Sequence, residues 1–84
     1  MPPKASKPPT STELKFEFSK LSTSGETEVW RVWHQNQTFL GGVEWFSYHR
    51  QYVFCPGDST SYPWKHLKDI AGFLEWLNAR KRSD

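Results

Sequence analysis

The side chains that could carry out chemistry are few. They are three histidines, one cysteine and two carboxylates near them in the sequence: His34, His49, His66, Cys55, Asp58 and Asp69. A cysteine beside a histidine can form a nucleophile and its base. Nothing around Cys55 resembles a recognised catalytic signature, however, and a small hydrophobic strand residue is the simpler interpretation. We therefore expect no enzymatic activity.

The same residues also form a potential zinc set, because three histidines and one cysteine supply four ligands. Their intervals along the chain are 15, 6 and 11 residues, in the order His34, His49, Cys55 and His66. Chelating pairs such as C-x₂-C or H-x₃-H are much shorter. No phosphate-binding glycine loop is present either, since the glycine pair at residues 41–42 is followed by Val-Glu. We expect neither a metal nor another cofactor.

Aromatic side chains dominate the sequence instead. Fourteen of the 84 residues are Phe, Tyr or Trp, and twelve of these lie between Trp30 and Trp76. Each such ring buries roughly 150–250 Å², and these rings dominate the energetics of cores and interfaces alike. The number exceeds what an ordinary core of this size needs. Some of the rings are therefore predicted to contact a partner.

Length and composition predict one small domain. Residues 1–12 are rich in proline and lysine with almost no apolar side chains, and we interpret them as a disordered arm. Residues 13–84 would form the domain, a size at which stability is marginal without a staple, a metal or a partner. The single cysteine excludes an intramolecular disulfide and fits a reducing compartment. No apolar run is long enough to span a bilayer, so we expect a cytoplasmic protein with no membrane partner.

Alternating and β-branched stretches predict strands at residues 14–20, 27–34, 39–46 and 51–55. The glycine pair inside the third stretch predicts a bulge or a sharp bend. A helix is predicted from Pro63, which suits a first helical turn, to about Lys81. The fold class is thus α+β: a three- or four-stranded antiparallel β-meander packed against one C-terminal helix.

A helical wheel predicts which side of this helix is buried. Its apolar residues form one arc about 160° wide, made of Leu67, Ile70, Ala71, Phe73, Leu74 and Leu77. Trp76 lies about 60° beyond this arc, one turn after Gly72. One interpretation is that Trp76 packs along the arm or a loop edge. The other is a partner contact, with the bare backbone at Gly72 allowing close approach.

The second predicted strand carries tryptophan on both faces. Trp33 shares one face with Val29 and Arg31, and Trp30 shares the other with Val32 and His34. A single helix covers only one face, so some rings must stay exposed, lie under the arm or be buried in a dimer. The partner-binding candidates on the sheet and helix sides are Trp30, Trp33, Trp45, Tyr48, Arg50, Gly72 and Trp76. Arg50 has a second interpretation, as a residue that only closes a hairpin turn.

Charge favours a protein partner over nucleic acid. Residues 21–79 carry four basic and six acidic side chains, while the positive charge lies at the two ends. Nucleic-acid-binding domains normally present a basic patch, whereas Trp, Tyr and Arg are typical of protein hot spots. The prediction is a small non-catalytic protein-binding module, with self-association as a homodimer an open alternative. A nucleic-acid-binding domain that stacks bases on the aromatic sheet face, with the basic termini contacting phosphates, is the less favoured alternative.

One further pattern covers residues 40–78. It consists of Trp45-Phe46, Arg50-Gln51-Tyr52, Phe54, Pro56, Leu67, Asp69-Ile70-Ala71 and Phe73-Leu74. It resembles short proteins of unassigned function carried by phages and prokaryotes, in which a W-F…R-Q-Y-x-F-x-P hairpin precedes a helix. The resemblance implies a phage or mobile-element accessory protein that acts by binding a host protein. It implies no activity and no site residues.

Overall fold

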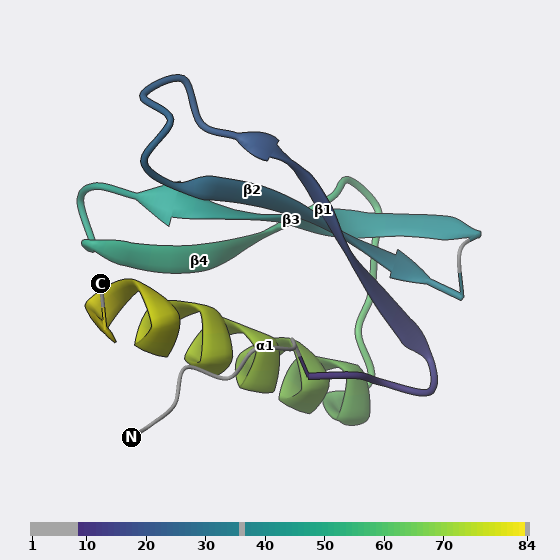
Figure 1. Ribbon diagram of the computed structural model, residues 1–84. Coiled ribbons are helices and arrows are strands. Elements are labelled where there is room, and N and C mark those ends of the chain that lie inside the picture. The colour runs from purple at the N-terminus through teal and green to yellow at the C-terminus, as the bar shows by residue number, and fades with distance from the viewer. Residues whose placement is uncertain (1–8, 36, 84) are drawn as a thin grey trace.

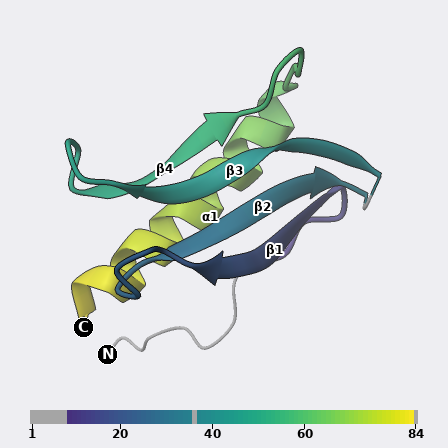
Figure 2. The ribbon, with the colours of Figure 1, turned by 90° about the horizontal axis from the view of Figure 1, so that it is seen from above.

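Four strands and one helix make up the fold in the computed structural model, which describes residues 9–35 and 37–83. The elements are β1 (Leu14–Leu21), β2 (Glu28–His34), β3 (Thr38–Phe46), β4 (Gln51–Pro56) and α1 (Trp64–Ser83). The strands form one antiparallel sheet in the order β1-β2-β3-β4. Figure 1 shows α1 against one face of the sheet, and Figure 2 shows the four strands side by side with α1 behind them. The predicted α+β meander is confirmed, with four strands.

The predicted irregularity near the glycine pair is a bulge at Leu40. The register of β2 with β3 shifts between Val32 and Trp33, so that Leu40 is the extra residue on β3. The bulge directs the Leu40 side chain into the core, where it is 6% exposed. Gly41 follows it and lies against β4, where an added Cβ would clash with the Cys55 carbonyl and come within 2.8 Å of the Phe54 ring. Glycine at this position lets the two strands approach.

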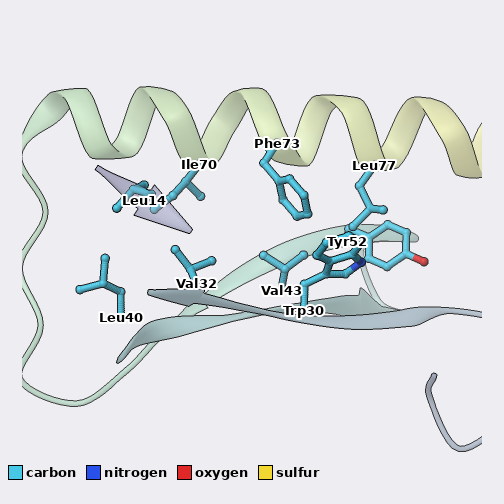
Figure 3. Packing of buried hydrophobic residues seen from close by; sticks show 9 residues of the cluster. All are labelled: Leu14, Trp30, Val32, Leu40, Val43, Tyr52, Ile70, Phe73 and Leu77. Carbon is cyan, nitrogen blue, oxygen red and sulfur yellow. The ribbon is translucent and has the colours of Figure 1, made fainter. Parts of the chain in front are cut away.

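The core lies between α1 and one side of the sheet. Every element contributes to the buried cluster (Figure 3), which consists of Leu14, Trp30, Val32, Leu40, Val43, Tyr52, Ile70, Phe73 and Leu77. Phe73 is fully buried, stacked on Phe16 at a centroid distance of 4.5 Å and edge-on to Trp30 at 5.0 Å. The helix therefore covers the side of β2 that carries Trp30, Val32 and His34.

The buried side of α1 differs from the predicted arc. The helix buries His66, Ile70, Phe73 and Leu77, whereas Leu67 is 49% exposed and Ala71 is also exposed. The centre of the buried arc is rotated by about 50° toward Trp76 relative to the prediction. His66 falls inside the predicted arc, so the difference lies at the other end of that arc, where Leu67 and Ala71 are apolar but exposed. No helix of the described chain is both long enough and apolar enough to cross a membrane.

The segment before β1 is attached to α1. Of the predicted arm, residues 1–8 lie outside the described part of the chain. Within residues 9–12, Ser11 Oγ donates to Asp69 Oδ2 over 2.8 Å and accepts from the backbone N–H of Leu14 over 3.1 Å. These two bonds connect the start of the sheet with the first half of the helix.

Candidate binding surface on the open sheet face

One face of the sheet is not covered by α1 (Figures 1 and 2). We call this side the open face. The strand register assigns to it the side chains that alternate with the core residues. They are Lys15, Glu17, Lys20, Val29, Arg31, Trp33, Phe39, Glu44, Phe46, Gln51, Val53 and Cys55. The sequence-based assignment of Arg31 and Trp33 to one face is thus confirmed.

An aromatic pair lies at one end of the open face. Trp33 on β2 and Phe39 on β3 are partners in the register, and their rings meet edge-on at 5.4 Å between centroids. Trp33 Nε1 donates a hydrogen bond of 2.9 Å to Glu17 Oε1 on β1. Phe39 is 43% exposed. Because the hydrogen bond orients the indole before any partner arrives, binding there would cost little side-chain entropy.

A second aromatic group lies at the opposite end, around the turn between β3 and β4. Phe46 contacts His49 at 5.1 Å and Tyr48 at 6.4 Å between ring centroids, and Tyr48 is 85% exposed. Arg50 closes this turn with its backbone, since its N–H donates to the Phe46 carbonyl over 2.8 Å at a φ of 56°. The turn-closing interpretation of Arg50 thus has a backbone basis, and its side chain is exposed.

The middle of the open face is polar and balanced in charge. Arg31 lies opposite Glu17 in the register, and Glu44 lies on the neighbouring strand. Cys55 Sγ donates to Glu44 Oε2 over 3.7 Å. Burial first, and then the charge and hydrogen bond of Glu44, raise the pKa of the Cys55 thiol. A thiol that stays protonated is a weak nucleophile.

Two of the predicted sheet-side tryptophans lie on the covered face instead. Trp30 is 8% exposed and belongs to the core. Trp45 packs edge-on against Tyr52 at 5.4 Å, and Lys81 Nζ lies 5.6 Å from the centre of its ring. The alternation of the strands separated the two faces correctly, but it did not indicate which face the helix would cover. Among the three sheet tryptophans, only Trp33 belongs to the open face.

Trp76 packs at the edge of the core. Its indole is perpendicular to that of Trp30 at 6.1 Å, and the Arg80 guanidinium lies 4.6 Å from its ring centre. Its Nε1 is buried with no hydrogen-bond partner among the described residues. Gly72, one turn earlier, has open space where a Cβ would be placed. Of the two helix-side candidates, Trp76 thus packs against the core, and Gly72 leaves space for a side chain beside it.

The basic end of α1 contacts the rest of the fold. Arg80 approaches Glu28 at 3.7 Å in addition to covering Trp76. Lys81 Nζ donates to the backbone carbonyl of Glu26 over 3.3 Å. Both cations therefore have partners within the domain, and these partners compete with any phosphate for their charge and hydrogen-bond donors.

The potential zinc and catalytic residues are dispersed. Cys55 lies on the open face, while His49 lies in the turn between β3 and β4. His34 and His66 lie together on the covered side at 5.3 Å between ring centroids, with Glu13 beside them. Sequence reasoning missed Glu13 entirely, because its intervals to the two histidines are long and no local motif marks the group.

Neither a protein-family model, nor a curated protein, nor a solved structure matches this chain. The resemblance of residues 40–78 to short phage and prokaryotic proteins stays a prediction. Function is therefore inferred from the geometry of the open face.

Proposed function

We propose that this protein is a small, non-catalytic module that binds another protein through its open face. The observation that carries the proposal is the Trp33–Phe39 pair, which lies on the uncovered side of the sheet with its indole oriented by Glu17. Tryptophan held in a fixed orientation is typical of the anchors that dominate protein interfaces. Phe46 and Tyr48 would add a second contact at the far end of the face.

The dimensions of the molecule suit this role. Four strands, of which the longest has nine residues, give the open face dimensions of roughly 19 by 30 Å, on the order of 600 Å². This is the area that one partner contributes to a protein interface at the small end of the range. Aromatic ends around a polar middle also match the mixed character of interfaces between proteins that fold separately. A folded protein surface is thus a better fit than a small ligand.

Charge supports a protein partner over nucleic acid. The open face carries three cations, Lys15, Lys20 and Arg31, against the two carboxylates Glu17 and Glu44, and Glu17 lies between the lysines on β1. Surfaces that stack bases normally combine aromatic rings with a positively charged groove that follows the phosphates. An aromatic pair among charges of both signs favours protein contact instead.

A narrower version of the proposal follows from the resemblance of residues 40–78. The module would be an accessory protein of a phage or mobile element, acting on a host protein in the cytoplasm. Its single, protonated cysteine is consistent with a reducing compartment.

Capture from a bacterial lysate tests the surface directly. The bait proteins are the wild type, the double variant Trp33→Ala/Phe39→Ala, and Trp64→Ala as a matched control. Trp64 is 67% exposed but lies at the start of α1, outside the open face. We expect one protein to be retained by the wild type and by Trp64→Ala, and lost from the double variant. Equal retention by all three would refute the assignment of the surface.

Two measurements distinguish the other partner classes. Concentration-dependent dimerisation in sedimentation, abolished in the double variant, would identify a second copy of the chain as the partner. Binding to single- or double-stranded nucleic acid is measured at low salt, where phosphate contacts are strongest. Tight binding there that weakens steeply with added salt would replace the protein-binding proposal with the nucleic-acid alternative.

A further inference from the structure

Three potential metal ligands converge on the covered side of the sheet. They are Glu13, just before β1; His34, the last residue of β2; and His66, in the first turn of α1. Each offers one ligand atom, and these atoms all lie within 4.8 Å of one another. His66 Nε2 and Glu13 Oε1 are 2.5 Å apart, and the two imidazole rings are 5.3 Å apart.

The fold holds these residues in place from three separate elements. Leu14 is opposite His34 in the register, and the Gln35 N–H donates to the Glu13 carbonyl over 3.0 Å. His66 is fixed by the helix, where its N–H donates to the Pro63 carbonyl over 3.0 Å. The His66 side chain is 8% exposed, whereas that of Glu13 is 51% exposed. The buried His66 side chain is thus held in place, whereas the exposed Glu13 side chain can change its conformation.

The contact with Glu13 does not fully account for the burial of His66. It satisfies one ring nitrogen, and Nδ1 of the same buried ring has no hydrogen-bond partner among the described residues. An unsatisfied buried polar atom costs about 1–3 kcal/mol. The contact with Glu13 therefore leaves one polar atom of this buried ring unsatisfied.

Two histidines and one carboxylate are a ligand set that zinc uses in proteins, with a fourth position left for water. Zinc–ligand distances of about 2.0–2.2 Å place tetrahedral ligand atoms roughly 3.4 Å apart. The ligand atoms of Glu13, His34 and His66 are now 2.5 Å apart at one pair and at most 4.8 Å apart at the others. Side-chain movements on the order of 1 Å would bring them to the tetrahedral separation. A hollow of about 300 Å³ adjoins the cluster and gives water access to it. It is lined by His34, His66, Leu40, Thr38, Ser59, Thr60 and Ser61.

We propose that Glu13, His34 and His66 bind one zinc ion, which joins the start of β1, the end of β2 and the first turn of α1. The ion would act as a staple for a domain of a size at which the core alone is marginal. The site lies on the covered side of the sheet, whereas Trp33 and Phe39 lie on the open face. If the zinc site proves wrong, the proposed protein-binding surface is unaffected. If the protein-binding surface proves wrong, the zinc site is unaffected.

Calorimetric titration of the tag-free full chain with zinc chloride tests the site. We expect one zinc per chain and a melting temperature raised on the order of 10 °C at about one hundred times the Kd. His34→Gln and Glu13→Gln should each weaken zinc binding by more than about tenfold. His49→Gln is the matched control, because His49 is the one histidine outside the cluster.

Cobalt substitution supplies a readout that does not depend on any variant folding. The wild-type chain loaded with one Co²⁺ should show the intense visible absorption of a four-coordinate ion, and added zinc should abolish it. Absence of stoichiometric zinc binding would overturn the proposal. So would equal affinities for the wild type, His34→Gln and Glu13→Gln, or a weak six-coordinate cobalt spectrum, because each result indicates only adventitious surface binding.

Discussion

The side-chain amide of Asn78 pairs with both backbone groups of Tyr52. The Tyr52 N–H donates to Asn78 Oδ1 over 2.7 Å, and Asn78 Nδ2 donates to the Tyr52 carbonyl over 3.3 Å. Tyr52 lies on β4, an edge strand of the sheet. Exposed edges are templates for pairing with other chains. At this point the helix takes the place of a neighbouring strand, so the pairing both docks α1 and protects the edge.

Asn78→Ala should lower the free energy of unfolding by about 1–3 kcal/mol, because it leaves two backbone groups of an edge strand without these bonds. Asn78→Asp keeps the acceptor for the Tyr52 N–H and loses only the donor, so its loss should be smaller. Urea unfolding monitored by tryptophan fluorescence measures both. Unchanged midpoints for Asn78→Ala would mean that the pairing contributes no net stability.

Alanine should have opposite effects at two glycines. At Gly41 the added methyl group would clash with the Cys55 carbonyl and the Phe54 ring, so Gly41→Ala should destabilise the fold by several kcal/mol or prevent folding. At Gly72 the same group meets open space inside a helix, so Gly72→Ala should stabilise by up to about 1 kcal/mol. Thermal melts followed by circular dichroism compare the two. A destabilised Gly72→Ala would show that this position is constrained in a way its open surroundings do not indicate.

Two tryptophans that contact each other should respond differently to phenylalanine. Trp30 Nε1 donates to Glu28 Oε1 over 2.8 Å within the core, so Trp30→Phe loses a hydrogen bond and leaves a cavity, at about 1–3 kcal/mol. Trp76→Phe instead removes a buried N–H that has no partner among the described residues. Its effect should be below about 1 kcal/mol. Denaturant midpoints that rank the two variants in the opposite order would contradict this assignment.

Glu44 should control the reactivity of Cys55. Burial raises the pKa of this thiol, and the charge and hydrogen bond of Glu44 raise it further. Only the thiolate is alkylated, so the labelling rate of the wild type should rise with pH along a curve displaced to high pH. Glu44→Gln removes the charge, so the curve should shift to lower pH without returning fully to that of an exposed cysteine. Iodoacetamide labelling followed by mass spectrometry gives both curves, and coincident curves would exclude any influence of Glu44.

Local patterns predicted the elements of the fold well. The β-branched and aromatic residues around Trp30 and Trp33 predicted the strand, and the two-residue period of strand geometry assigned its side chains to two faces. The glycine pair marked the bulge to within two residues. The buried side of α1 was predicted less well, because apolar character alone does not separate the exposed Leu67 and Ala71 from the buried residues of the helix. His66 is buried as well, and its partner Glu13 lies 53 residues earlier in the chain.

The candidate surface was predictable only in part. An excess of aromatic rings indicated that one sheet face would stay uncovered, and Trp33 was among the residues named for it. Which face this would be depends on how α1 packs, so Trp30 and Trp45 could not be separated from Trp33 by sequence. Phe39 was missed because it lies before the bulge, where simple alternation along β3 fails.

The order of the strands in the sheet is also the order in which a ribosome makes them. Each hairpin closes across a short turn, so the meander can form while the chain is still being synthesised. The helix that covers Trp30 and Val43 is made after all four strands, and it carries Phe73 and Leu77 of the core. Until α1 docks, the face of the nascent sheet that carries Trp30 and Val43 is apolar and exposed, the condition in which partly folded chains aggregate. The yield of folded protein should therefore depend on how soon the twenty residues of α1 follow the sheet.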